Sequence, residues 1–198
     1  LLGPCLPTWH RLLKLASAPA ELVRGNGHWT VWMNGAAARR GIAAWHKTPI
    51  GTATFRELTH DELGILGTAL RSRPAGGLAF SGSGQVTEPQ RLREVLLSAF
   101  HARGGQSEIG EVTKISANDQ GVEAHIAGRT LKADRALIAA GAWSRALMEQ
   151  LGVKTPLIGE RGYSVKSAEH SWPTSLPPIF FEERWVVVTR FVDGLRPT

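Results

Sequence analysis

Residues 131–151 combine residue types that suit ligand binding. The residues of 135–140 are mostly small and apolar, a composition typical of a strand buried within a parallel sheet. Gly141 follows directly, and a residue without a Cβ lets the backbone turn sharply and lets a ligand approach it closely. Apolar side chains then recur at helical spacing, namely Trp143, Leu147 and Leu151. A strand, a glycine turn and a helix N-terminus form the phosphate-binding arrangement of many α/β proteins, although an ordinary strand–turn–helix unit gives the same pattern.

The rest of the sequence offers no second arrangement with recognisable chemistry. Its seven histidines and one cysteine are dispersed without the spacing of metal ligands, so we predict no metal site. Gly82-Ser-Gly84 lacks the third glycine of a dinucleotide-binding fingerprint, because Thr87 stands at that position. Paired carboxylates and nucleophile–base triads are also absent at any recognisable spacing. We therefore predict no catalytic side chain.

Composition restricts the class of protein. The chain has 198 residues, 42% of them hydrophobic, which is enough for one large domain or two small ones with a real core. The single cysteine, Cys5, excludes an internal disulfide framework and suits a reducing compartment. The net charge of +6 comes from scattered lysines and arginines, which favours anionic small molecules over nucleic acid as ligands. No apolar run has the length of a transmembrane segment, and the start, at Leu1, carries no secretory pattern.

Local patterns predict an α/β fold of the mixed α+β kind. Asn34 and Thr59 each precede a helical pattern and can cap it, and Thr87 with Pro89 marks another helix start. The expected helices are 8–23 with an interruption at Pro19, 34–45, 59–70 and 87–103. The expected strands are 28–33, 52–55, 111–117, 122–126, 129–133, 179–181 and 185–191. Turn residues separate the strands of 111–133 and predict a β-meander.

The last predicted strand contains an arginine on an apolar face. Residues 179–181 and 185–191 are predicted to form a hairpin about Glu182-Glu183, and side chains alternate between the two faces of its second arm. Arg190 ends the face that carries Val186 and Val188. Such an arginine is either a rim residue that reaches water or a placed anion ligand.

Four segments, in this order, resemble one known family. Thr87–Arg103 is similar to the helix that follows the family's strand-and-loop crossing, and Ala133-Asp134 through Ser144 is similar to its AD-x-x-x-x-A-x-G-x-W/Y-S motif. Glu160–Ser164 resembles its K/R-G-Y-S strand, and Phe180 through Arg196 resembles its T-R-F hairpin. The family is the FAD-dependent D-amino-acid dehydrogenases, within the wider group of D-amino-acid and glycine/sarcosine oxidases.

The resemblance implies a division of the chain and a set of cofactor contacts. Residues 85–152 would be part of a Rossmann-like FAD-binding domain with the β-meander, and residues 1–84 and 153–198 would belong to an antiparallel-sheet substrate domain. By resemblance, four residues lie at the cofactor: Val112 at the adenine, Ala140 and Gly141 at the diphosphate and ribose, and Trp143 nearby.

The resemblance also implies an activity and a substrate side. The reaction would be oxidative deamination of a D-amino acid to a 2-oxo acid and ammonia, with FAD taking the electrons and a quinone or another acceptor reoxidising it. Tyr163, Arg190 and Arg196 are the substrate-side candidates, because an arginine fork matches a carboxylate in two hydrogen bonds. We expect a cytoplasmic protein, with peripheral attachment to the inner membrane as the alternative.

Two alternatives remain open at this stage. One is an amine oxidase of the glycine/sarcosine type, which would use oxygen instead of a quinone or dye. The other is a non-catalytic fragment, because the family's strand–GxGxxG–helix and its glycine-rich C-terminal strands are not among these residues. The resemblance thus implies an internal segment of a longer protein, which by itself we expect to bind FAD poorly.

Overall fold

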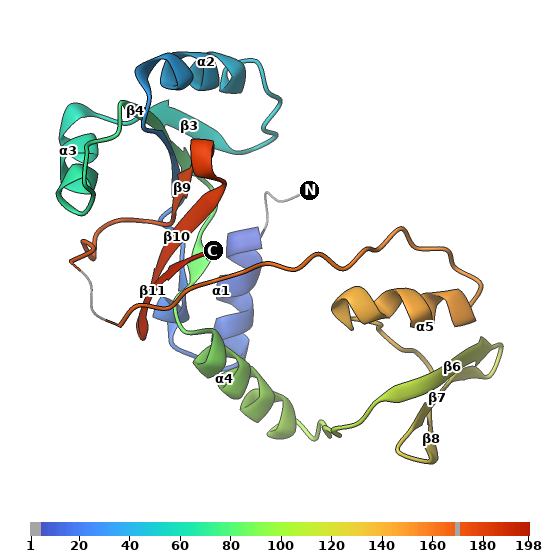
Figure 1. Cartoon of the computed structure of the whole chain (residues 1–198). Coiled ribbons are helices and arrows are strands. Elements are labelled where there is room, and N and C mark those ends of the chain that lie inside the picture. Colours follow the sequence, from blue (N-terminus) through green and yellow to red (C-terminus); the bar gives the residue numbers. More distant parts are fainter. Residues whose placement is uncertain (1–4, 169–170) are drawn as a thin grey trace. The chain divides into compact units, whose positions relative to one another are not determined.

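The computed structural model describes residues 5–168 and 171–198, and the chain forms two compact units (Figure 1). The first unit consists of Leu1–Gly105 together with Tyr163–Thr198, and the second is Gln106–Gly162. The unit boundaries therefore lie at 105/106 and 162/163, whereas the sequence-based division lies at 84/85 and 152/153. No helix of the described residues is both long enough and apolar enough to cross a bilayer.

A mixed β-sheet forms the centre of the first unit, with strand order β11-β10-β9-β2-β4-β3. Its strands are β2 (His28–Trp32), β3 (Thr54–Glu57), β4 (Gly76–Ser81), β9 (Ile179–Phe181), β10 (Val186–Phe191) and β11 (Gly194–Pro197). Neighbouring strands are antiparallel except for β2 and β9, which run parallel. This pair joins segments from opposite ends of the sequence. The α/β class is confirmed, and the sheet predicted as antiparallel contains this parallel pair.

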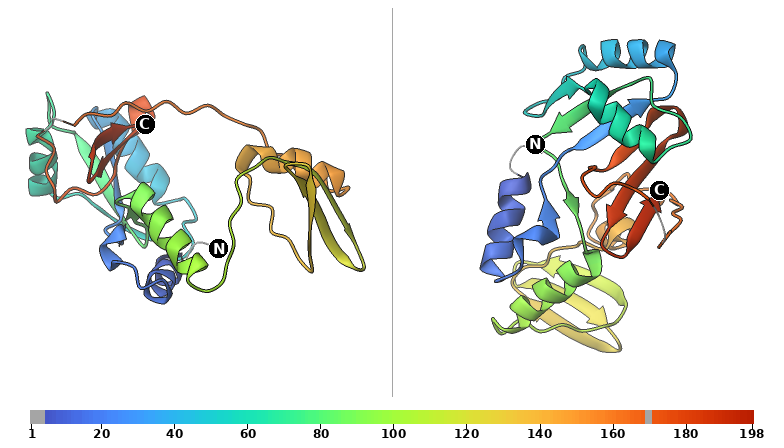
Figure 2. Two further views of the ribbon diagram at one scale, coloured as in Figure 1. Left: turned by 90° about the horizontal axis from the view of Figure 1, so that it is seen from below. Right: turned by 90° about the vertical axis from the view of Figure 1, so that its left-hand side faces the viewer.

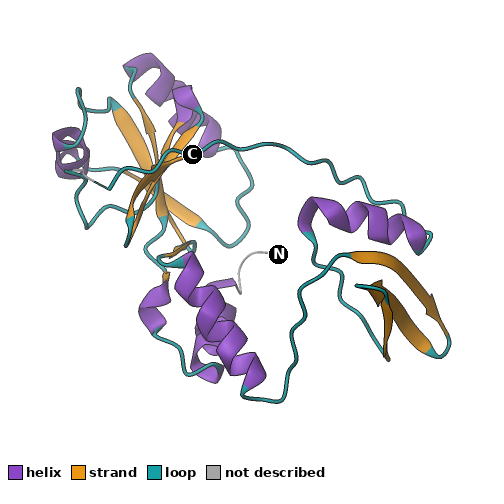
Figure 3. Cartoon of the chain, turned by 60° about the horizontal axis from the view of Figure 1, so that its bottom comes forward, coloured by secondary structure: helices purple, strands orange, loops and turns teal. Residues whose placement is uncertain are grey.

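Two helices pack on opposite faces of the sheet (Figure 3). Helix α3 (His60–Thr68) buries Leu63 and Leu66 in a core that includes Val31, while α2 (Gly35–Trp45) lies in a core that includes Trp32. Because successive residues of a strand point to opposite faces, these neighbouring residues of β2 separate the two cores. Both predicted caps are confirmed: the Asn34 side chain accepts from two α2 amides, and Thr59 forms a complete capping box with Glu62.

A third core lies between α1 (Cys5–Leu15) and α4 (Pro89–His101), whose axes lie at an angle to each other in Figure 2. It is closed by η1 (Ala20–Leu22) and by the short pair β1 (Val23–Arg24) and β5 (Gln85–Val86). The predicted capping role of Thr87 is wrong. Its hydroxyl donates instead to the Glu21 carbonyl oxygen at 2.9 Å, and the N-cap position of α4 is Glu88. The buried Thr87 thus joins α4 to η1.

The hairpin of β9 and β10 is confirmed, but its turn is longer than the sequence indicates. The turn is η3 (Glu182–Arg184), followed by Trp185 in the left-handed region with φ +52°. Trp185 therefore precedes the strand, which starts at Val186. Both carboxylate oxygens of Glu183 accept from the Met33 amide, and one also accepts from the Asn34 amide at 3.0 Å. This carboxylate holds the turn against the start of α2.

The second unit contains the predicted meander, β6 (Val112–Asn118), β7 (Gly121–Ile126) and β8 (Arg129–Ala133), followed by η2 (Gly141–Trp143) and α5 (Ser144–Gln150). The prediction of a buried strand at 135–140 is wrong. These residues are not assigned to a strand, and Leu137 is 92% exposed. An apolar run indicates that a segment tends to be buried, but a strand also needs a neighbouring strand for its hydrogen bonds. No described strand pairs with residues 135–140. The helix predicted from the spacing of Trp143, Leu147 and Leu151 is also shorter than expected, because α5 begins at Ser144 and ends at Gln150.

Candidate functional site

The predicted turn at Gly141 is present and open. Gly141 has φ +57°, a left-handed conformation that favours glycine, and a Cβ built there meets no described atom within 4 Å. Two contacts hold the turn: the Ala140 amide donates to Ser144 Oγ at 2.9 Å, and the Trp143 amide donates to the Ala140 carbonyl oxygen. The Trp143 side chain is 81% exposed. The turn therefore presents an open backbone and an indole ring to solvent.

Val112 belongs to the same unit and begins the edge strand β6. A register shift separates it from Lys114, so the strand is irregular where it starts. A side chain of α5 binds the free edge of this strand: Gln150 Oε1 accepts from the Ile115 amide at 3.0 Å, and Gln150 Nε2 donates to the Thr113 carbonyl oxygen at 3.5 Å. The Val112 segment and the helix that follows the Gly141 turn are thereby linked.

The guanidinium of Arg196 is held in place on one face of the sheet. Arg196 Nη2 contacts both carboxylate oxygens of Asp193, at 2.9 and 3.2 Å, and its Cζ lies 4.6 Å from the centre of the Phe191 ring. Asp193 also pairs with Lys166 at 2.7 Å. These cations, Lys166 foremost, lower the pKa of Asp193. Nε and Nη1 of Arg196 make no hydrogen bond to any described residue, so the three N–H groups of these two atoms remain for a ligand.

Arg190 lies on the other face. Arg196 pairs with Thr189 across β10 and β11, and directly opposed residues share a face, whereas the adjacent Arg190 points the opposite way. Arg190 Nη1 donates to the Trp172 carbonyl oxygen at 2.6 Å, on the side covered by α3. The two arginines therefore do not converge on one carboxylate.

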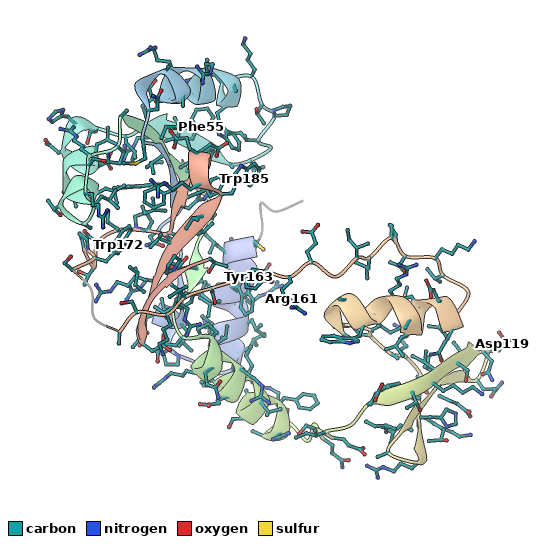
Figure 4. The ribbon with its side chains drawn as sticks, in the orientation of Figure 1. Phe55, Asp119, Arg161, Tyr163, Trp172 and Trp185 are labelled. Carbon is teal, nitrogen blue, oxygen red and sulfur yellow. The ribbon has the colours of Figure 1, made fainter. Side chains whose placement is uncertain are left out.

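Tyr163 precedes a segment that lies beside β11. The Val165 amide donates to the Pro197 carbonyl oxygen at 3.1 Å, and Ser167 forms an antiparallel bridge with Leu195. Tyr163 itself is 78% exposed and is labelled, with Trp172, in Figure 4. The tertiary structure thus brings the segment that follows Tyr163 next to the strand that carries Arg196.

The candidate residues divide between the two units. Val112, Ala140, Gly141 and Trp143 all lie in the second unit, and the substrate-side candidates, Tyr163, Arg190 and Arg196, all lie in the first. The roles of these residues at a cofactor or at a substrate stay predictions.

The sequence did not reveal several residues that position these candidates. They are Ser144, Gln150, Phe191 and Asp193. Ser144 could have been found from its place after the glycine turn, because a hydroxyl there can accept a backbone amide. Phe191 and Asp193 lie within five residues of Arg196 in the β10–β11 hairpin, so a prediction of this hairpin would have found them. The contact of Gln150 depends on which helix meets which strand, and no local pattern predicts it.

Comparison with known proteins identifies relatives of the chain. A curated glycine oxidase from Geobacillus kaustophilus (strain HTA426) is 28% identical over 154 residues, which is 78% of this chain and 37% of that protein. Two solved structures share the fold: iminodiacetate oxidase from Chelativorans sp. BNC1, with TM-score 0.73 and 19% identity, and glycine oxidase from Geobacillus kaustophilus, with TM-score 0.69 and 20% identity. Each covers 99% of this chain, which spans 53% and 52% of their respective lengths.

One family profile matches almost the whole sequence. It is the DAO family, described as FAD-dependent oxidoreductases, and the match runs over residues 4–197. The match includes the Gly141 turn as well as the strands that carry Arg190 and Arg196. The chain therefore belongs to the DAO family of FAD-dependent oxidoreductases, whose cofactor is FAD.

Proposed function

We propose that the protein containing this chain oxidises the Cα–N bond of an amino acid by FAD-dependent oxidative deamination. The observation that carries the proposal is Arg196, a guanidinium beside an aromatic ring whose Nη1 has no hydrogen-bond partner among the described residues. An unpaired guanidinium N–H donates a charge-assisted hydrogen bond to a carboxylate. Every amino acid presents such a carboxylate. The family membership and the glycine oxidase relative support the same class of reaction.

The residues of the Gly141 turn fit the cofactor in one testable respect. FAD is large and must lie close to the backbone, and the open side of Gly141 admits such an approach because no described atom lies within 4 Å of a Cβ built there. In this proposal Gly141 and Ala140 lie at the diphosphate and ribose, Trp143 covers them, and Val112 lies at the adenine. The Ala140 amide donates to Ser144 Oγ and its carbonyl oxygen accepts from the Trp143 amide, so the contact of Ala140 with the cofactor would be a close approach of its backbone.

FAD, when bound, supplies the two-electron acceptor for the substrate. The residues of this chain then bind and orient. Arg196 fixes the carboxylate, Phe191 holds the guanidinium plane, and Tyr163 lies on the substrate side with them. Arg190 supports the sheet from its other face through the Trp172 carbonyl oxygen.

Two substrates are the first to test. Glycine follows from the glycine oxidase relative, and D-alanine follows from the Glu160–Ser164 and Thr189–Phe191 segments, which resemble D-amino-acid dehydrogenases. We expect glycine or D-alanine to bleach the flavin absorbance of the FAD-loaded protein under anaerobic conditions. Absence of bleaching with glycine, D-alanine and a panel of other D- and L-amino acids would exclude the proposed reaction. Hydrogen peroxide formed in air indicates an oxidase, and reduction of a quinone or dye alone indicates a dehydrogenase.

Two arginine variants separate the assigned roles. Arg196→Met should raise KM at least about tenfold, because a charge-assisted hydrogen bond contributes about 1.5–3 kcal/mol. Arg190→Met removes the same charge from the opposite face and should change KM much less. Equal effects on KM would contradict the assignment of the carboxylate to Arg196. Titration of the 198-residue chain with FAD tests the remaining alternative, a non-catalytic fragment, which should not bind the cofactor tightly.

A further inference from the structure

An apolar groove of about 870 Å³ lies between α4 and the sheet of the first unit. Ligand pockets have volumes of about 300–1,000 Å³, so this groove is large enough for a small molecule. Its walls are mainly apolar side chains from α4, β5 and β10: Val86, Leu92, Leu96, Leu97, Thr189 and Phe191. Nothing in the cofactor and substrate roles assigned above uses this groove.

The groove lies directly beside Arg196. Thr189 is the residue that opposes Arg196 across the strands, and Phe191 is the ring on which its guanidinium lies, and both line the groove. Arg93 of α4 lines it as well. An apolar space flanked by a cation suits a molecule with a carboxylate at one end and an apolar chain at the other.

A polar groove of about 440 Å³ shares Pro89 with the apolar groove and contains Arg196. Side chains of both signs line it, namely Arg91 and Arg196, and Glu88, Glu94 and Asp193. A carboxylate alone needs cations only, whereas an amino acid in its zwitterionic form also carries an ammonium group. The mixture of charges therefore complements the head of an amino acid.

We propose that the substrate is an amino acid with a large apolar side chain, which enters the α4–β10 groove while its carboxylate lies on Arg196. This inference rests on the proposed function and narrows its substrate class. Glycine has no side chain and would leave the groove empty. A hydrophobic pocket discriminates by about 10–200-fold for even one methylene group, so leucine should exceed glycine in kcat/KM by at least about tenfold.

The first test measures binding without any reaction. The 198-residue chain is titrated with 4-methylpentanoate, which is leucine without its amino group, and with acetate, while NMR follows the Leu97 methyl groups and the Arg196 Nε–H. We expect 4-methylpentanoate to shift both signals and acetate to shift only that of Arg196. If 4-methylpentanoate leaves the Leu97 methyl groups unchanged, the groove does not take the side chain and the inference is wrong.

The second test uses the FAD-loaded protein and both enantiomers of leucine, with glycine as reference. Leu97→Trp fills the groove from α4 and should lower kcat/KM for leucine at least about tenfold without lowering it for glycine. Ser98→Trp adds the same ring to the next position of the helix, outside the groove lining, and should change neither value. Thermal melts of both variants establish that the fold is retained.

The outcomes separate this inference from the proposed function. Oxidation of amino acids with glycine equal to or better than leucine, or an equal loss for both substrates in Leu97→Trp, would overturn the inference and leave the reaction intact. Oxidation of no amino acid would overturn the proposed function, and the NMR titration would still decide whether the groove binds an apolar carboxylate.

Discussion

The ionised carboxylate of Glu62 stabilises the first unit, so its protonation in acid should make this unit markedly less stable. One of its oxygens accepts from Arg56 Nη1 at 2.7 Å and from the Thr59 amide at 2.9 Å, and the other accepts from Arg56 Nη2 at 2.6 Å. The contact with Arg56 is the largest cause that lowers the pKa of Glu62, from its ordinary value of 4.5 to about 2. The same side chain completes the capping box of α3.

The structure gives the size of this effect. At about 1.36 kcal/mol per pKa unit, the lowering corresponds to at most about 3.4 kcal/mol. The Arg56 side chain is 58% exposed, so solvent screens the pair, and we expect about 1–2 kcal/mol. Because the pKa of Glu62 is lower in the folded chain than in the unfolded chain, this stabilisation is complete above about pH 4.5 and is lost as the pH falls to about 2.

Urea unfolding monitored by tryptophan fluorescence measures the contribution of Glu62 to the stability of the first unit, because all tryptophans except Trp143 lie in that unit. Glu62→Gln should lower the free energy of unfolding by about 1–2 kcal/mol at pH 7, and the difference from the parent should shrink between pH 4.5 and pH 3. The exposed Glu57→Gln is the matched control and should have little effect. A loss in Glu62→Gln that is the same at pH 7 and pH 3, or no larger than that in Glu57→Gln, would refute this account.

Three further substitutions test other contacts of the fold. Glu183→Gln should destabilise the first unit by about 1 kcal/mol in urea unfolding, because the amides of Met33 and Asn34 lose a charged acceptor. Gly141→Ala should destabilise the second unit by about 1–2 kcal/mol, because the left-handed conformation costs an L-residue that much even where the Cβ has space; fluorescence of Trp143 follows it. Gln150→Ala should speed hydrogen exchange at the Ile115 amide, which loses its acceptor.

Matched residues supply the controls for the first two of these substitutions. Glu182→Gln changes the adjacent carboxyl group, whose pKa is raised by burial and by the charge of Glu183, so it should not destabilise the fold as Glu183→Gln does. Gly162→Ala adds a Cβ where none of the described atoms lies within 4 Å and where φ is not positive, so it should cost less than Gly141→Ala. An equal cost at Gly162 would contradict the role assigned to the conformation of Gly141.

The sequence by itself determined the elements whose signals are local. The caps at Asn34 and Thr59 were predictable because a side chain three or fewer residues away satisfies the helix amides, and the meander of 112–133 was predictable because its turns lie within the same segment. The turn at Gly141 was also predictable from the sequence, because it depends on the backbone conformation of this single residue. The family motifs, which are short and continuous, were visible for the same reason.

Only the tertiary structure decided the contacts that join distant segments. The parallel pairing of β2 with β9 and the contact of the Thr87 hydroxyl with Glu21 both join segments that are more than 60 residues apart in the sequence. The apolar residues 135–140 show the same limit, because their composition predicted a strand but could not supply its partner. Composition and spacing predict the local structure that each segment prefers. The groove beside Arg196, in contrast, exists only because α4, β5 and β10 pack together, and the local preferences of these segments do not determine that packing.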